Sequence, residues 1–119
     1  MKKYLVLLAL VTIISCDSDH KIPGIKIISP EEGQTFASGN NVNIKVKISD
    51  DGDSIMNEEL FVITQSNDTI VNIKNGDFCF EYEFDENIQV QSNTQYKIIV
   101  KARGGHGNWN SKTINIICN

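Results

Sequence analysis

One short segment near the C-terminus gathers the side chains that are best suited to binding a ligand. Arg103, His106, Asn108 and Trp109 lie within seven residues and include the only arginine and the only tryptophan of the chain. An exposed indole offers a large apolar face with one hydrogen-bond donor, which suits stacking on a sugar ring or anchoring a protein partner. The alternative, which we expect, is that Trp109 folds back to cap the core while the neighbouring glycines supply positive φ angles. Residues 103–110 are therefore a candidate binding loop.

A second candidate is an acidic loop that offers oxygen ligands. Asp50, Asp51 and Asp53 fall within four residues, and carboxylate oxygens are the ligands that Ca²⁺ prefers. The spacing is poor for calcium because Ile55 stands where a further oxygen would be needed, and Asp and Gly are common turn residues. We therefore expect a solvated turn and no cofactor, with a calcium site as the alternative.

The sequence offers little for catalysis. Neither His20 nor His106 accompanies a Ser or Cys nucleophile in a known motif, and the sequence contains no HExxH motif and no paired Cys/His spacing. Glu81 and Glu83 share one strand face, but carboxylates on an open face are normally solvated and not tuned for acid–base work. We therefore expect that the protein is not an enzyme.

The beginning of the chain indicates export and lipid attachment. Two lysines precede an apolar run, residues 4–14, which is shorter than the roughly 18 residues that a membrane-spanning helix needs. The run is followed by Ile-Ile-Ser-Cys, ending at Cys16. This quartet resembles the lipobox of bacterial lipoproteins. The resemblance implies a cleaved signal peptide, residues 1–15, and acylation of Cys16. The acyl chains would then anchor the protein to the membrane.

Residues 16–23 are expected to form the lipidated cysteine and a flexible polar tether. The acidic run Asp17-Ser18-Asp19 resembles the export tag of surface lipoproteins of the Bacteroidetes, and a plain linker is the alternative. We expect localisation in the cell envelope, lipid-anchored to the outer membrane, with the periplasmic or the surface face left open. The formal net charge of −4 at pH 7 argues against nucleic acid as a partner, because nucleic-acid binders are basic.

The elements that must position the candidate loops are strands. Residues 24–119 consist of short β-type runs separated by Gly, Asn, Asp and Ser, and the chain length of 119 residues suits one domain. Apolar and polar side chains alternate most clearly from Val42 to Ile48 and from Tyr96 to Ala102, which predicts half-buried strands. The expected strands are residues 25–28, 34–37, 42–48, 60–64, 69–73, 77–84, 96–102 and 112–117, with a tight hairpin at residues 74–76. The pattern predicts an all-β sandwich of about seven antiparallel strands, and a small barrel is the alternative.

Side-chain parity bears on the two remaining cysteines. In the expected strand 77–84 the four large aromatic side chains, beginning with Phe78, share one face, which we assign to the core. Cys79 then points to the opposite face, whereas Cys118 shares the core-facing parity of its strand. A disulfide between these two cysteines is therefore not expected.

Several of these segments together resemble a known family. The opening Ile27-Ile28-Ser29-Pro30 leads into the alternating strand 42–48 and then Ser49-Asp50-Asp51, and near the other end Tyr96–Ala102 is followed by Gly107-Asn108. These features resemble the bacterial Ig-like domains of Bacteroidetes surface lipoproteins, although Arg103-Gly104 stands where an acidic residue is usual. The resemblance implies an Ig-like or fibronectin-like sandwich, and it implies no activity.

We therefore expect a non-enzymatic, membrane-anchored lipoprotein whose Ig-like module binds a protein or glycan partner or serves as a spacer in the cell envelope. One alternative is a glycan-binding accessory lipoprotein that uses residues 103–110. Another is a small Ig-fold protease inhibitor, although the inhibitor motif Asn-Pro-Thr-Thr-Gly is missing from the sequence.

Overall fold

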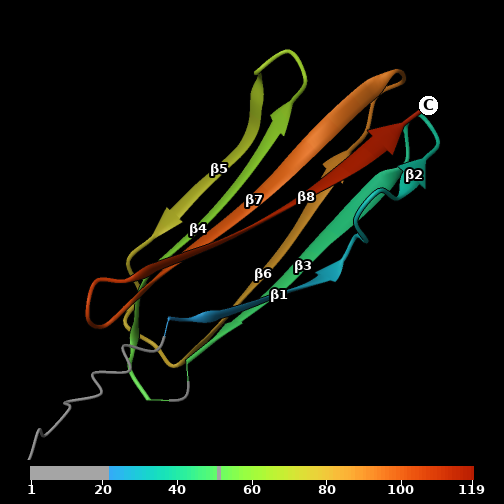
Figure 1. Cartoon of the computed structure of the whole chain (residues 1–119). Helices are drawn as coiled ribbons and strands as arrows, with labels where there is room; N and C mark the ends of the chain where they lie inside the picture. The colour runs from blue at the N-terminus through green and yellow to red at the C-terminus, as the bar shows by residue number, and fades with distance from the viewer. Residues whose placement is uncertain (1–21, 51) are drawn as a thin grey trace, which may run out of the picture.

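The computed structural model describes residues 22–50 and 52–119, which form an all-β sandwich of two sheets. The predicted signal peptide, Cys16 and Asp51 lie outside the described residues. One sheet has the strand order β1-β3-β6, and the other has the order β2-β8-β7-β4-β5 (Figure 1). The strands are β1 (Gly24–Ser29), β2 (Thr35–Phe36), β3 (Asn41–Ser49), β4 (Ile55–Thr64), β5 (Thr69–Asn75), β6 (Glu81–Gln89), β7 (Thr94–Gly104) and β8 (Trp109–Cys118). The predicted Ig-like sandwich is thereby confirmed.

The core lies between the two sheets and is built by the predicted alternation. In β3 the inward side chains from Val42 to Ile48 are at most 2% exposed, and in β7 the inward series from Tyr96 to Ala102 is at most 3% exposed. Burial of each such side chain contributes about 1.5–3 kcal/mol to stability. Cys118 also faces the core, as predicted, and it forms no disulfide.

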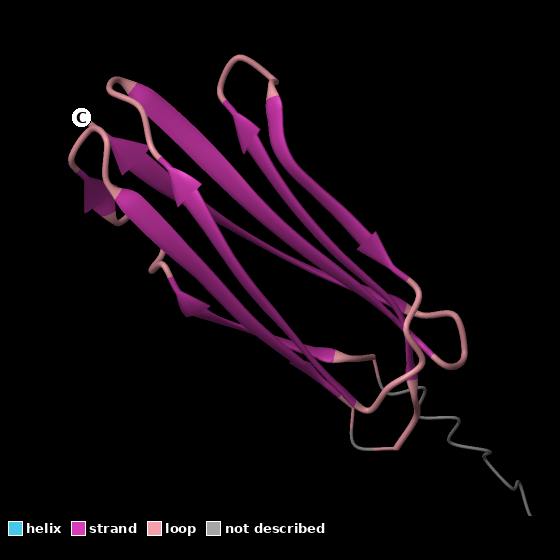
Figure 2. Ribbon diagram, turned by 180° about the vertical axis from the view of Figure 1, so that it is seen from behind, coloured by secondary structure: helices cyan, strands magenta, loops and turns pink. Residues whose placement is uncertain are grey.

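The predicted hairpin at residues 74–76 is wrong. Strand β5 is an edge of the five-stranded sheet, whereas β6 pairs with β3 in the other sheet, so the chain crosses the end of the sandwich between them (Figure 2). The antiparallel register of β3 and β6 joins Asn41 to Gln89 and Ser49 to Glu81. Because β3 offers a partner along its whole length, β6 also continues through residues 85–89, beyond the end of the predicted strand 77–84.

The predicted faces of residues 77–80 are inverted. The side chains of Phe78 and Phe80 are 72% and 65% exposed, whereas Cys79 packs against the core. Cys79 faces inward because its backbone pairs with Ile55: its N–H donates to the Ile55 carbonyl at 3.2 Å, and its carbonyl accepts from the Ile55 N–H at 2.6 Å. Strand β6 begins only after a bend at Phe80, and the aromatic side chains point toward the core only within β6.

One end of the sandwich carries both candidate loops and the N-terminal connection. Gly24 pairs with Ser49, which pairs in turn with Glu81, so the chain enters β1 at the end where β3 stops and β6 starts. The β7–β8 loop lies at the same end, and the C-terminus lies at the opposite one (Figure 1). We call the first the tether end (residues 22–23, 50, 52–54, 76–80 and 104–108) and the other the far end. No helix that is long and apolar enough to cross a membrane occurs in the described part of the chain.

Candidate functional site

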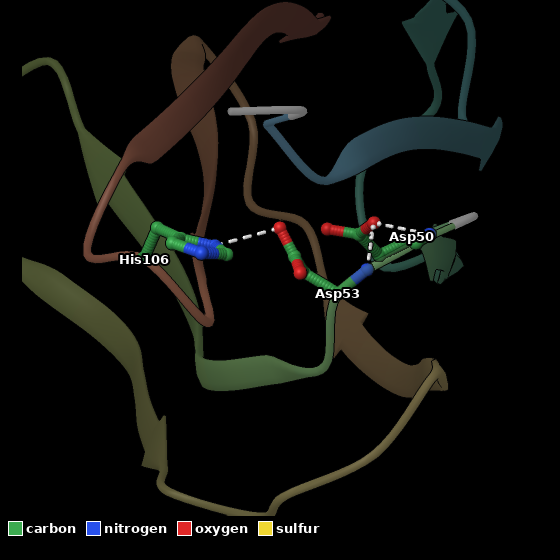
Figure 3. A network of polar contacts seen from close by, with 4 residues as sticks. Asp50, Asp53 and His106 are labelled. Atoms are coloured by element: carbon green, nitrogen blue, oxygen red, sulfur yellow. Dashed lines mark hydrogen bonds and ion pairs between the residues drawn. The ribbon is translucent and has the colours of Figure 1, made fainter. Parts of the chain in front are cut away.

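The two candidate loops, which are far apart in the sequence, touch each other at the tether end. The Nδ1 atom of His106 lies 2.8 Å from Oδ2 of Asp53, although the two residues are 53 positions apart in the sequence (Figure 3). Gly105 lies against Ser54 so closely that a Cβ at position 105 would be 3.2 Å from the serine Oγ. The acidic loop and residues 103–110 therefore form one continuous surface, which the sequence alone did not indicate.

In the acidic loop, Asp50 acts as a structural cap. It is 9% exposed, and its Oδ1 accepts hydrogen bonds from the backbone N–H groups of Gly52 and Asp53, each at 3.1 Å (Figure 3). This Asx-type turn is a common use of an aspartate at the start of a loop. Among the described residues, no group of three His, Cys, Asp or Glu side chains could hold a metal ion. Calcium binding stays the untested alternative to a solvated turn, because the third candidate ligand, Asp51, is not among those residues.

Arg103 and Asn108 stabilise the β7–β8 loop through contacts with the turn of the same loop. Gly107 has φ +88°, and a Cβ there would lie 3.3 Å from Nη2 of Arg103, so the guanidinium group lies against the turn. The Nε atom of Arg103 is buried without a hydrogen-bond partner. The Asn108 carbonyl accepts from the Gly104 N–H at 2.8 Å and closes the turn. These two predicted binding residues thus support the loop backbone.

Trp109 does not cap the core, and this expectation was wrong. Its side chain is 48% exposed at the start of β8. The next residue, Asn110, instead pairs with the buried Ala102 and donates from Nδ2 to the Pro23 carbonyl at 2.8 Å. Because strand side chains alternate, the indole must then lie on the outer face of the five-stranded sheet. It borders a shallow hollow of about 390 Å³ that is also lined by Glu59, Lys101, Asn110 and Ser111.

Strand β4 holds a buried carboxyl group that was not predicted. Glu58 in β4 is fully buried; its Oε1 accepts from the Cys79 thiol at 3.0 Å, and its Oε2 has no hydrogen-bond partner. Burial raises the pKa of Glu58, and the nearby charge of Asp77 acts in the same direction. Glu58 has the same parity as Leu60 and Val62, which are both buried. That parity was the signal in the sequence that could have revealed it.

Neighbours of Glu58 extend this polar cluster. Burial, followed by the hydrogen bond to Glu58, raises the pKa of Cys79 to about 12. Burial also raises the pKa of Tyr82, whose hydroxyl accepts a hydrogen bond from the side chain of Asn75. A thiol that stays protonated at neutral pH is a weak nucleophile. The cluster is therefore suited to holding the tether end together, and poorly suited to covalent chemistry.

A polar groove of about 520 Å³ lies at the far end, beside the turn between β4 and β5. Its lining is rich in amides and hydroxyls, which can both donate and accept hydrogen bonds. Tyr96 has a structural role here, because its hydroxyl accepts from the backbone N–H of Gln91 at 2.8 Å. The groove was not predicted, since its residues come from four separate segments: 64–71, 87–89, Gln91 and 94–96.

Comparison with known proteins decides the family. The sequence profile of the bacterial Ig domain matches residues 23–100, well over half of the chain. The chain belongs to the bacterial Ig domain family. Among curated proteins, no sequence matches that of this Ig domain.

Two solved structures resemble this Ig domain in fold. The fibronectin(III)-like modules of CbhA from Clostridium thermocellum superpose with a TM-score of 0.51 at 15% identity, covering 81% of this chain and 97% of theirs. The CARDB domain of a Pyrococcus furiosus protein, in complex with di-metal ions, gives a TM-score of 0.55 at 12% identity, covering 83% of this chain and 90% of its own. Identities this low indicate a common architecture alone.

Proposed function

We propose that the protein is a non-enzymatic lipoprotein, anchored by acyl chains on Cys16, whose Ig domain acts as a binding or spacer module at a membrane surface. The observation that carries the proposal is the position of the N-terminal connection at one end of an elongated sandwich. An Ig-like module is consistent with either binding or spacing, and the lipobox-like sequence supplies the anchor.

The short tether would fix the direction in which the module points. Only five residues lie between Cys16 and Ile22, so the six residue steps that join them span at most about 20 Å. The longest strand, β7, has 11 residues and extends over about 35 Å. The tether end would therefore stay close to the lipid surface, while the far-end groove would be held away from it. That arrangement suits a module that presents its outer end to a partner.

The polar groups of the domain support a role without catalysis. The carboxyl group with the clearest pKa shift, Glu58, is enclosed in the sandwich and bonded to a thiol that stays protonated. Asp53 and His106 do meet at the surface. Their contact joins two loops, and a catalytic role would further require a bound substrate within reach of the pair.

Metabolic labelling with a clickable fatty acid tests the anchor. The wild-type protein should incorporate the label, and Cys16→Ser should not. Cys79→Ser is a matched control, because it removes another thiol while keeping a donor toward Glu58, and it should be labelled like the wild type. Absence of label from the wild type, or its persistence in Cys16→Ser, would contradict the proposal.

Glycan binding is a second candidate function, favoured by the exposure of Trp109 beside a hollow whose other lining residues are polar or charged. An indole beside carboxylate, ammonium and hydroxyl groups can stack on a sugar ring while its neighbours bond the ring hydroxyls. Titration of the protein with a glycan panel, followed by tryptophan emission, tests this directly because Trp109 is the only tryptophan. Emission that no glycan changes, together with unchanged acrylamide quenching, would rule this candidate out.

A further inference from the structure

Two phenylalanine rings stand exposed at the tether end. Phe78 and Phe80, at 72% and 65%, are the most exposed large hydrophobic residues in the described part of the chain. The backbone pairing of Cys79 with Ile55 holds this segment extended at its centre. Cys79 packs against the core between them while both phenylalanines are exposed, so the two rings lie on the side of this segment that faces away from the core. Together they form a small apolar surface on a fixed backbone.

We propose that Phe78 and Phe80 insert into the lipid interface next to the anchor, so that the domain contacts the bilayer through these rings as well as through Cys16. This inference rests on the proposed lipidation of Cys16. The row Gly24–Ser49–Glu81 crosses three neighbouring strands, so the N-terminal connection and the start of β6 lie about 10 Å apart. The maximum tether length of about 20 Å then brings the rings within reach of the surface that holds the acyl chains.

The tether itself is unsuited to covering the rings. Residues 17–21 are Asp, Ser, Asp, His and Lys, which bury poorly against aromatic surface. Ile22, the first described residue after them, is itself 51% exposed and adds to the apolar surface of this end. A bilayer interface is the one apolar phase that the anchor places permanently beside these side chains, and Phe is a common residue on interfacial faces.

The charges of the tether end indicate which kind of contact this is. Asp50, Asp53 and Asp77 lie at this end, and His106 there lies 2.8 Å from Asp53, so the described part of the tether end carries no excess of positive charge that would favour an anionic surface. The contact is therefore apolar and independent of attraction to acidic headgroups. Apolar insertion should persist at about 1 M salt, where the Debye length is only about 3 Å and surface electrostatics are screened.

Depth-dependent fluorescence quenching tests the insertion in the full mature chain. Trp109→Phe removes the native signal, and Phe78→Trp then places one indole at the proposed contact. The lipidated protein is reconstituted in phosphatidylcholine vesicles with or without brominated acyl chains. We expect bromolipid to quench Trp emission strongly at position 78, at low and at high salt. Ile70→Trp in the same background is the matched control, because Ile70 is a 44% exposed apolar residue at the far end, and its emission should not change.

Each other outcome overturns the inference in a recognisable way. If the protein is acylated by mass and vesicle-bound, yet the indole at 78 is quenched by aqueous acrylamide and not by bromolipid, the rings face water and only the anchor stands. If the indole is shielded from both quenchers, the rings contact protein, for example a second copy. If the mature chain carries no acyl groups, the proposed function fails, and the inference that rests on it fails with it.

Discussion

The buried carboxyl group of Glu58 should make the stability of the domain depend on pH in an unusual direction. A carboxyl group whose pKa is raised on folding binds a proton more tightly in the native state than in the unfolded one. Its contribution to stability is fully present below the ordinary pKa of about 4.5 and is lost as the pH rises through the folded-state value. Exposed carboxylates that form ion pairs behave in the opposite way.

The magnitude follows from proton linkage. Between the unfolded and folded pKa values of Glu58, the native state holds about one more proton, so its contribution to the free energy of unfolding falls by about 1.4 kcal/mol per pH unit. Glu58→Gln keeps the shape of the side chain and removes the titration. The difference in stability between the wild type and Glu58→Gln should therefore shift in favour of glutamine as the pH rises from about 4.5.

Urea unfolding followed by circular dichroism, repeated from pH 4.5 to neutrality for both proteins, measures this difference. Glu59→Gln is the matched control. The Glu59 side chain neighbours Glu58 in the sequence, but it is only half-buried and lies outside the polar cluster. The substitution removes the same charge from the same strand and should follow the wild-type pH dependence. If the difference between the wild type and Glu58→Gln does not change with pH, Glu58 is already ionised in the native state, and the reasoning from burial is refuted.

Three further predictions concern the cysteine, the core and the acidic loop. Cys79, with its pKa raised to about 12, should react with a thiol reagent at pH 8 at least a hundredfold more slowly in the folded protein than in urea, and equal rates would contradict its burial. Ile98→Ala, at a position with 0% exposure, should lower the free energy of unfolding by about 2–5 kcal/mol, and a loss below about 1 kcal/mol would contradict the packing of the core. Millimolar calcium should leave the melting temperature unchanged, because Asp50 caps the backbone and Asp53 pairs with His106; a rise of several degrees, reversed by a chelator, would show a calcium site instead.

The sequence predicts the strands best where polar and apolar side chains alternate without interruption. Strand β3 was predicted to within one residue at each end and β7 to within two, because one face of each predicted run is apolar throughout. The pattern fails around Cys79, where it correctly states that Phe78 and Phe80 share a face but assigns that face to the core. The alternation of side chains along a strand predicts which of them share a face. Which face is buried depends on the partner strand, here β4 through Ile55.

The candidate site was only partly predictable. Residues 50–53 and 103–109 were identified separately from their composition, but their contact depends on the order of strands in the two sheets. Glu58 was overlooked because its acidic neighbours made the whole segment resemble a solvated loop. Its burial is enforced from outside the segment, since β4 must continue toward the tether end to pair with β7 as far as Gly104.

The lipid anchor is tested most directly by the intact mass of the protein purified from membranes of the cell that makes it. We expect a chain that begins at Cys16 and carries the added mass of a diacylglyceryl group, with or without a further acyl chain. A chain that begins elsewhere, or that begins at Cys16 without added mass, would contradict the lipid anchor and with it the orientation proposed for the domain.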